Sequence, residues 1–466
     1  MTIKLDFVDF GKHEELLGVT GNPIFHSKSP FIFNTIFQQQ NLNNRYHYIK
    51  LAANTPGEAM FLFKELKLKG MNVTAPFKRS IMDYLDIIDP AAEKIDAVNT
   101  VTWEKMCIKG YNTDHTGVTQ ALKETGMGIK LEGKQCIVVG AGGAGRAAVY
   151  GLLKEKAMVT LVNRTYSKAT QTANEFGCEA KEISSLQHLL KDADILVSTL
   201  PAGIDIIQED WLHKELVVLD ANYKQTLLCK MAKEKGCQVV RGEQWLLYQA
   251  IPAYQYFMGD LPKDFAVLEA TKYALCEVLH SPVPKNIALV GFMGSGKSLI
   301  GERLAKKLGM DFKDLDVLIE KEAGCSIPDI FRLHGESTFR SMERFILKQE
   351  MQNNQGVVYA CGGGIVLEEE NRRVLEETSL VVWLYSSIAT TLKRIQPGTS
   401  HTNHTRHTGH TRPLLDCPEP ENTAEQLLND RLFRYAQASN LVVSSENEPS
   451  QVVEKIINEI GKTVKN

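Results

Sequence analysis

The sequence lacks any apolar run of the roughly 18 residues that a membrane-spanning helix requires, and it also lacks a strong excess of charge of either sign. Its 53 Lys and Arg stand against 56 Asp and Glu, which gives a formal net charge of -3. Proteins that attract nucleic acid or anionic membranes carry a basic excess. We therefore expect small molecules as partners, with no nucleic acid and no membrane.

Cysteine is sparse and shows no pairing pattern. The nine cysteines are spread over 466 residues without a CxxC motif, so neither a disulfide framework nor a zinc site is predicted. The first residues, MTIKLDFVDFGKHEELLG, lack the features of a secretory signal or a transit peptide. These absences favour a cytoplasmic protein with reduced thiols. The sequence indicates no particular oligomeric state.

Strand-like and helix-like segments alternate along the chain, which is typical of α/β domains with parallel sheets. LLGVTG has the apolar character of a short strand, and the helix after it is expected to begin at Ser29, with Pro30 in its first turn. A second helix, from Gly57, is predicted to end at Gly70. Two prolines in HSPVPKN mark a linker.

The length of the chain predicts two to four domains. The predicted divisions are an αβ substrate domain at 1–117 with return helices at 241–279, a Rossmann dinucleotide domain at 118–240, a linker at 280–285 and a P-loop domain at 286–466.

The stretch VGAGGAG, residues 139–145, matches GxGxxG between a predicted strand and a predicted helix. The glycines allow a tight turn, close approach of a pyrophosphate and close packing of the helix, whose N-terminus favours phosphate. The predicted contacts with the dinucleotide are Gly140, Gly142, Gly143 and Gly145.

The next strand ends in VNRT, where an NAD enzyme would carry an acidic residue for the ribose hydroxyls. This chain has Asn163, Arg164 and Thr165 there, with Lys168 close behind. Arg and Lys suit a 2′-phosphate, so NADP(H) is preferred to NAD. The alternative interpretation is a solvated basic turn.

The stretch GFMGSGKS, residues 291–298, matches GxxxxGK[ST] between another strand and helix. In such a loop backbone N–H groups surround the phosphates of ATP, the lysine neutralises the β and γ oxygens, and the hydroxyl binds Mg²⁺. The predicted ATP contacts are Gly291, Gly294, Ser295, Gly296, Lys297 and Ser298, of which Ser298 also binds the metal.

Four further motifs, GNPIFHSKSP, NVTAPFK, DAVNT and YNTDHTG, resemble shikimate dehydrogenase, and the resemblance covers nearly all of residues 14–279. It implies that Lys78 and Asp114 form the catalytic pair. An ammonium beside the substrate ketone stabilises developing negative charge, and a carboxylate orients that ammonium. The resemblance implies further contacts: Ser27 and Ser29 with the substrate carboxylate, Asn72, Thr74, Asn99 and Gln249 with the ring hydroxyls, Tyr223 as a lining residue, and Gly242 with the cofactor.

The last part of the chain, about residues 286–460, resembles shikimate kinase through CGGGIV, RPLL, RLFRYAQAS and the segment from Phe312 to Phe345. The resemblance implies that Asp316 binds the acceptor hydroxyls and acts as the base, and that Asp314 and Ser298 hold Mg²⁺. It implies that Arg340, oriented by Glu343, and Arg431 bind the substrate carboxylate. Gly363 and Gly364 are implied to contact the substrate through their backbone, and Arg412 to contact the transferred phosphate. The adenine-side arginine is left open between Arg394 and Arg406.

Together the two resemblances imply consecutive reactions: reduction of 3-dehydroshikimate with NADPH, and phosphorylation of shikimate with ATP and Mg²⁺. The alternatives are a quinate dehydrogenase in the first part, another small-molecule kinase such as a gluconate kinase in the last, or one part that binds without catalysing. The segment from His401, with four His-Thr repeats, is interpreted as a polar lid rather than a metal site, because no acidic or cysteine ligands accompany it.

Overall fold

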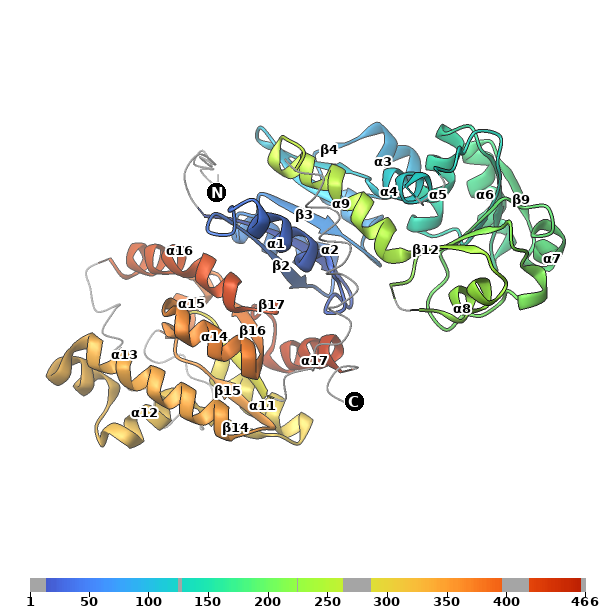
Figure 1. Cartoon of the computed structure of the whole chain (residues 1–466). Coiled ribbons are helices and arrows are strands. Elements are labelled where there is room, and N and C mark those ends of the chain that lie inside the picture. The colour runs from blue at the N-terminus through green and yellow to red at the C-terminus, as the bar shows by residue number, and fades with distance from the viewer. Residues whose placement is uncertain (1–13, 125–127, 224, 263–285, 396–418, 462–466) are drawn as a thin grey trace. The chain divides into compact units, whose positions relative to one another are not determined.

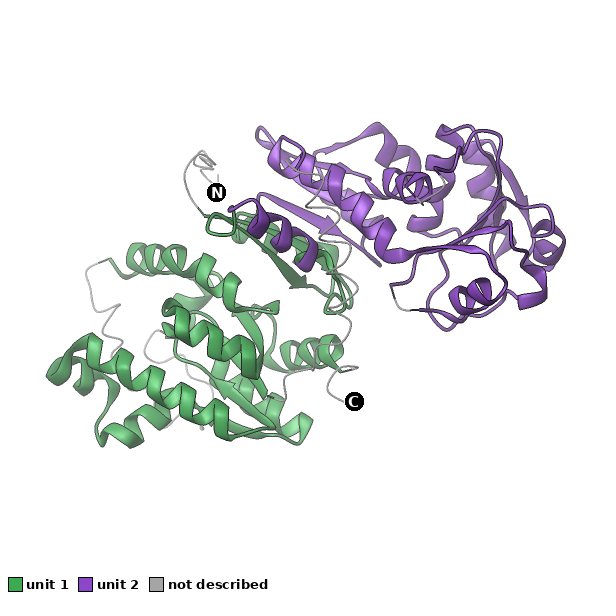
Figure 2. Cartoon of the chain, viewed as in Figure 1, with its two compact units in different colours: residues 1–30, 42–68, 280–466 green, residues 31–41, 69–279 purple. Residues whose placement is uncertain are grey.

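The computed structural model describes residues 14–124, 128–223, 225–262, 286–395 and 419–461. It divides into two compact units, which Figure 2 distinguishes by colour: unit 1 comprises residues 1–30, 42–68 and 280–466, and unit 2 comprises residues 31–41 and 69–279. The predictions for the linker at 280–285, the His-Thr repeats, Arg406 and Arg412 lie outside the described residues. The predicted domain boundaries stay predictions.

Unit 2 contains a six-stranded parallel sheet in the order β12-β11-β10-β7-β8-β9. This order reverses beside β7, as it does in Rossmann dinucleotide-binding domains. The strands are β7 (Gln135–Val139), β8 (Met158–Val162), β9 (Glu179–Lys181), β10 (Ile195–Ser198), β11 (Val217–Asp220) and β12 (Gln238–Arg241). The helices between them are α5 (Gly143–Lys154), α6 (Tyr166–Phe176), α7 (Leu186–Leu189) and α8 (Leu227–Glu234).

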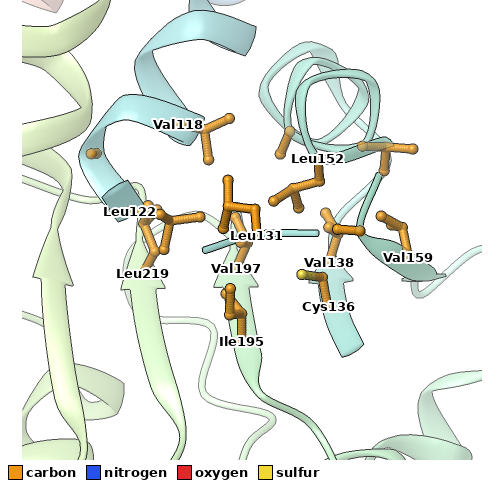
Figure 3. Packing of buried hydrophobic residues seen from close by; sticks show 14 of the residues in the cluster. Val118, Leu122, Leu131, Cys136, Val138, Leu152, Val159, Ile195, Val197 and Leu219 are labelled. Atoms are coloured by element: carbon orange, nitrogen blue, oxygen red, sulfur yellow. The ribbon is translucent and has the colours of Figure 1, made fainter. Parts of the chain in front are cut away.

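The core on one face of this sheet is built from the apolar runs that predicted the strands. Val138, Val197 and Leu219 project from neighbouring strands and pack against Leu122 and Leu152 from the helices above them (Figure 3). All five side chains are fully buried. Burial on both faces explains why these strands have almost continuous apolar sequences. The predicted α/β class with a Rossmann domain is confirmed.

The rest of unit 2 surrounds a small mixed sheet, in which β5 pairs antiparallel with β3 and β6, and β4 pairs with β6 in parallel. Its elements are β3 (Gly70–Val73), β4 (Ile87–Ile88), α3 (Pro90–Ile95), β5 (Thr100–Glu104), β6 (Cys107–Tyr111), α4 (Asp114–Lys123) and α9 (Gly242–Met258). Figure 1 labels β3, β4 and the three helices. Helix α1 (Ser29–Gln39) begins at Ser29 as expected.

The prediction that the second helix ends at Gly70 is wrong. That helix, α2 (Pro56–Glu65), ends five residues earlier, and Gly70 is the first residue of β3. A Cβ at Gly70 would lie 2.1 Å from the ring of Phe257. The glycine therefore reflects close packing against α9 and does not mark a helix end.

Within unit 1, seven strands run parallel in the order β14-β15-β13-β16-β17-β2-β1. The first five belong to the P-loop part of the chain: β13 (Asn286–Val290), β14 (Asp311–Asp314), β15 (Val357–Ala360), β16 (Ser379–Tyr385) and β17 (Leu441–Ser444). The other two are β1 (Glu15–Gly21) and β2 (Tyr46–Ala52). Two strand segments that lie far apart in the sequence thus pair directly, with Val442 opposite Leu51.

The helices of the P-loop part alternate with its strands, which confirms the predicted parallel-sheet fold of this domain. They are α11 (Lys297–Leu308), α12 (Leu315–Ala323), α13 (Ile327–Asn353), α14 (Glu369–Thr378), α15 (Ile388–Ile395), α16 (Pro420–Ala438) and α17 (Pro449–Ile460). Helix α13 is broken at Gly335, whose φ of 78° and ψ of 168° are not helical. Only glycine adopts such an angle readily.

In the described part of the chain, no helix is long and apolar enough to cross a membrane. The same residues hold no group of three or more His, Cys, Asp or Glu side chains suited to a metal ion. The seven cysteines among them are free thiols.

Candidate active sites

Lys78 and Asp114 form a close ion pair in unit 2. Lys78 lies in the loop after β3, and Asp114 is the first residue of α4. Nζ of Lys78 donates to Oδ2 of Asp114 at 2.5 Å, and the two side chains are 18% and 11% exposed. A carboxylate at this distance restricts the ammonium to one place, from which it can donate to a substrate oxygen.

The buried amide of Asn99 binds the second carboxylate oxygen of Asp114 and connects it to further buried amides. Nδ2 of Asn99 lies 3.0 Å from Oδ1 of Asp114 and 3.0 Å from Oε1 of Gln249. Nδ2 of Asn72 donates to the carbonyl oxygen of Asn99 at 3.1 Å. The structure thus brings together four of the predicted residues with Lys78 beside them, although they come from segments far apart in the sequence.

Several members of this network were not predicted, among them Thr113 and Trp245. Oγ1 of Thr113 donates to Oε1 of Gln249 at 3.1 Å, and Nε1 of Trp245 donates to the backbone oxygen of Asp114 at 2.9 Å. Both were within reach of sequence reasoning. Thr113 adjoins Asp114, and Trp245 lies one helical turn before Gln249, so it shares the same face of α9.

The structure places the other residues that the resemblance to shikimate dehydrogenase implies as follows. The carbonyl oxygen of Thr74 accepts from the N–H of Phe77 at 3.0 Å, which forms the turn before Lys78. Burial, followed by the charge of Asp114, raises the pKa of Tyr223. Ser27, in unit 1, has its Oγ 3.4 Å from Oγ of Ser29. The predicted substrate contacts of these residues stay predictions.

The glycines after β7 form an open phosphate cradle. Gly140 has a φ of 111°, and a Cβ there would lie 2.3 Å from Oγ1 of Thr199, whereas a Cβ at Gly145 would lie 1.8 Å from the carbonyl oxygen of Gly140. A Cβ at Gly142 would meet no described atom within 4 Å, so a pyrophosphate can approach this backbone. A Cβ at Gly143 would lie 3.4 Å from Cδ of Lys78, so the cradle borders the ion pair.

The basic turn after β8 also fits a phosphorylated ribose. Oδ1 of Asn163 accepts from the N–H of Ala141 at 3.3 Å, and its Nδ2 donates to the carbonyl oxygen of Thr165 at 3.0 Å. The side-chain amide of Asn163 therefore connects the turn to the glycine loop. Arg164 and Lys168 are exposed beside it, where their charges are accessible to a 2′-phosphate.

Gly242, the first residue of α9, packs closely against the turn that precedes Tyr223. A Cβ at Gly242 would lie 2.5 Å from the carbonyl oxygen of Ala221. The predicted contact of Gly242 with the cofactor stays a prediction.

The P-loop has the backbone conformation that phosphate binding requires. Gly291, Gly294 and Gly296 all have positive φ, and the N–H of Ser295 closes the loop onto the carbonyl oxygen of Phe292 at 3.2 Å. The P-loop lysine also binds the loop: Nζ of Lys297 donates to the carbonyl oxygens of Gly291 at 2.9 Å and Phe292 at 3.0 Å. The ammonium therefore lies over the loop, where the β and γ phosphates of ATP would bind.

A hydroxyl and two carboxylates lie beside this loop. Oγ of Ser298 donates to Oδ2 of Asp314 at 2.6 Å, and Oδ1 of Asp314 accepts from the N–H of Asp316 at 3.0 Å. Hydroxyl and carboxylate oxygens are the ligands that Mg²⁺ prefers, so the pair Ser298 and Asp314 fits the metal. Burial, followed by the charge of Asp314, raises the pKa of Asp316 to about 7.

The triple-glycine turn after β15 gathers charged side chains around Asp316. Nη1 of Arg340 donates to Oε2 of Glu343 at 2.8 Å, as the predicted orienting role of Glu343 requires. A Cβ at Gly362 would lie 2.7 Å from Oε1 of Glu343 and 3.0 Å from Oδ1 of Asp316, and one at Gly364 would lie 2.4 Å from Arg340. Larger residues at these glycines would displace the charged groups.

Helix α16 contributes the second predicted arginine. Nη1 of Arg431 donates to the carbonyl oxygen of Gly363 at 3.3 Å, and the residue is 6% exposed. The hydroxyl of Tyr435 donates to the same oxygen at 2.5 Å. Tyr435 was not predicted, although its position four residues after Arg431 places it on the same helical face.

Arg394 is the one candidate for the adenine-side arginine that lies among the described residues. Its Nη2 donates to the carbonyl oxygen of Ser445 at 2.6 Å, and its Nη1 lies 3.4 Å from the carbonyl oxygen of Gly294 in the P-loop.

Three family models match separate parts of the chain. The shikimate dehydrogenase substrate-binding domain matches residues 19–101, the shikimate/quinate 5-dehydrogenase family matches residues 120–228, and the shikimate kinase family matches residues 293–461.

Individual proteins agree with the first two matches. The NADP(+) shikimate dehydrogenase of Aquifex aeolicus is 39% identical over 258 residues, which cover 54% of this chain and 94% of that protein. The crystal structure of an Aquifex aeolicus shikimate dehydrogenase superposes with a TM-score of 0.52 at 37% identity, over 56% of this chain and 97% of the other. A shikimate dehydrogenase solved with NADP+ has a TM-score of 0.52 at 30% identity, over 57% of this chain and 96% of the other.

Proposed function

Since the chain belongs to the shikimate dehydrogenase family and carries a shikimate kinase domain at residues 293–461, we propose that it catalyses two consecutive reactions. The first reduces 3-dehydroshikimate to shikimate, and the second phosphorylates shikimate to shikimate 3-phosphate. The product of the first site is the substrate of the second. The proposed partners are these small molecules, and the proposed location is the cytoplasm.

In the first reaction Lys78 supplies the electrostatic and proton-transfer chemistry. Its ammonium donates a hydrogen bond to the ketone oxygen and stabilises the negative charge that develops there. Bound NADPH supplies the hydride to the carbonyl carbon. The ammonium then passes a proton to the new alkoxide and regains one from solvent, while Asp114 keeps Nζ oriented. Asn72, Asn99 and Gln249 supply the amide groups for the ring hydroxyls.

In the second reaction Asp316 accepts the proton of the attacking hydroxyl, and the oxygen forms a bond to the γ-phosphorus as ADP leaves. Arg340 and Arg431 hold the carboxylate of shikimate, each with a fork of N–H donors. Lys297 neutralises phosphate charge at the P-loop. Mg²⁺ held near Ser298 would neutralise charge on the β and γ oxygens.

The observation that carries the proposal is the presence of both catalytic groupings in one chain. Nζ of Lys78 lies 2.5 Å from Oδ2 of Asp114, beside the dinucleotide loop. Arg340, Asp316 and Arg431 gather at the triple-glycine turn. A substrate that carries both a carboxylate and ring hydroxyls would engage all of these groups.

A variant of the P-loop lysine tests the assignment of the two reactions. Lys297→Ala should abolish ATP-dependent phosphorylation of shikimate and keep the oxidation of NADPH by 3-dehydroshikimate. Loss of both activities in a folded variant would contradict two independent sites. Parallel assays with quinate and shikimate, each with NADP+ and NAD+, would show whether the first site prefers the proposed substrate pair.

A further inference from the structure

A carboxylate of the kinase domain holds a loop of the dehydrogenase part. The loop of residues 22–28 connects β1 with α1 and carries Ser27. Glu459 lies in the last turn of α17, within the residues that match the shikimate kinase family. Its Oε2 accepts from the backbone N–H of Ile24 at 2.7 Å and from that of Phe25 at 2.9 Å. A side chain more than 400 residues away in sequence thus completes the hydrogen bonding of this loop.

Two lysines carry charge that opposes that of this carboxylate: Lys455 pairs with it, and Lys50 binds the loop. Nζ of Lys455, one helical turn before Glu459, lies 3.7 Å from its Oε1, and both side chains are almost fully buried. Nζ of Lys50, on β2, donates to the carbonyl oxygen of Phe25 at 2.6 Å and lies 4.8 Å from the centroid of its ring. Burial lowers the pKa of Lys50 to about 8, and the charge of Glu459 opposes that shift. A buried charge is retained when it is paired and hydrogen-bonded in this way.

The hydrogen bonds that fix Ile24 and Phe25 also fix the two serines that follow them in the chain. The N–H of Ser27 donates to the carbonyl oxygen of Ile24 at 2.9 Å, so Ser27 is placed by the residue whose own N–H binds Glu459. Oγ of Ser27 accepts from the N–H of Ser29 and lies 3.4 Å from its Oγ. One short turn therefore links Glu459 to both hydroxyls that we propose for the substrate carboxylate.

We propose that Glu459 is a positioning residue for the reduction of 3-dehydroshikimate, because it fixes the backbone of the loop that presents Ser27 and Ser29. The inference rests on the proposed role of these serines. It means that affinity for the dehydrogenase substrate depends on a residue of the kinase domain. This dependence requires no transfer of substrate between the two sites.

Steady-state kinetics of the full chain with Glu459→Ala and Glu459→Gln test this role. Alanine leaves the buried N–H of Ile24 and the partly buried N–H of Phe25 without their acceptor, so KM for 3-dehydroshikimate should rise about tenfold. KM for NADPH and kcat should stay within about twofold, because the variant alters neither the cofactor loop nor Lys78. Glutamine keeps an oxygen that accepts from both N–H groups, so it should restore most of the affinity. A merely structural role would instead lower the reduction and phosphorylation rates together.

The matched control is Glu454→Ala on the same helix. Glu454 is exposed and pairs with Lys307, away from the loop of residues 22–28. Its removal should leave KM for 3-dehydroshikimate unchanged. If Glu459→Ala does not fold, Lys50→Met replaces it, because this change removes the hydrogen bond to the carbonyl oxygen of Phe25 and should raise the same KM.

Hydrogen–deuterium exchange of the backbone amides measures how firmly the loop is fixed, independently of enzyme activity. In Glu459→Ala the amides of residues 22–28 should exchange faster than in the wild type, and in Glu454→Ala they should not. Unchanged exchange together with an unchanged KM in folded Glu459→Ala would overturn the inference. A wild type that does not reduce 3-dehydroshikimate would instead overturn the proposed function, and the exchange rates would still report on Glu459.

Discussion

The side-chain amides of Asn99 and Gln249 meet at 3.0 Å, although 150 residues separate them in the chain. Nδ2 of the same Asn99 lies 3.0 Å from Oδ1 of Asp114. Helix α9, which follows the last strand of the Rossmann sheet, thus contributes Gln249 to the network around the carboxylate of Asp114. Because all three residues are buried, the network fixes their geometry.

Removal of either Lys78 or Asp114, the proposed catalytic pair, should abolish most of the reduction of 3-dehydroshikimate. Lys78→Met loses the ammonium that stabilises the alkoxide, and Asp114→Asn loses the charge that orients it. We expect kcat for 3-dehydroshikimate to fall by about 100- to 10,000-fold. Shikimate phosphorylation by the same variants is the internal control and should keep its wild-type rate. A fall of less than about tenfold in kcat would contradict the assigned chemistry.

The basic turn after β8 should determine the choice of cofactor. The double variant Arg164→Ala, Lys168→Ala removes two exposed cations from the proposed 2′-phosphate site. KM for NADPH should rise about 10- to 100-fold, while KM for NADH should change little. Lys191→Ala removes an exposed lysine elsewhere in the same domain and serves as the control. An equal rise in KM for both cofactors would refute the preference for a 2′-phosphate.

Arg431 should contribute to binding in the kinase reaction alone. In Arg431→Lys a single ammonium replaces the planar fork, so KM for shikimate in phosphorylation should rise about 10- to 100-fold. KM for 3-dehydroshikimate in the reduction should not change. Arg434→Lys is the matched control, since Arg434 lies on the same helix but pairs with Glu14. An unchanged KM for shikimate would exclude the carboxylate clamp.

Phosphorylation should depend on pH through Asp316. Burial and the charge of Asp314 raise the pKa of Asp316 to about 7, so its carboxyl is protonated below that pH and ionised above it. Because the proposed base must be ionised, kcat/KM for shikimate should rise as the pH increases through about 7. The reduction, measured in the same buffers with the same protein, controls for general effects on the fold. A kcat/KM for phosphorylation that is flat across neutral pH would argue against Asp316 as the base.

The sequence allowed prediction of those features in which chemistry dictates residue type at a fixed spacing. The glycines at 140, 142 and 145 suit a tight turn, an approaching phosphate and close helix packing. The structure shows the turn at Gly140 and the close packing at Gly145, and a Cβ at Gly142 would meet no described atom within 4 Å. Arg340 and Glu343 lie three residues apart on one helix, and so their contact follows from helical geometry.

Other features depend on contacts between distant segments, which periodicity does not reveal. Strands β2 and β17 pair directly, yet nothing in the sequence of either segment indicates this pairing. The acceptor that Glu459 provides for Ile24 and Phe25 is hidden for the same reason. Gly70 was misinterpreted because a glycine after a helix usually marks its end, whereas here the ring of Phe257 excludes a side chain.

A single assay with the purified full chain tests the central claim most directly. It supplies 3-dehydroshikimate, NADPH, ATP and Mg²⁺, and it follows the oxidation of NADPH together with the mass of the phosphorylated product. We predict that each NADPH oxidised leads to one shikimate 3-phosphate once the reaction is complete. Folded protein that consumes NADPH without forming this product, or that consumes none, would contradict the assignment of two consecutive reactions to one chain.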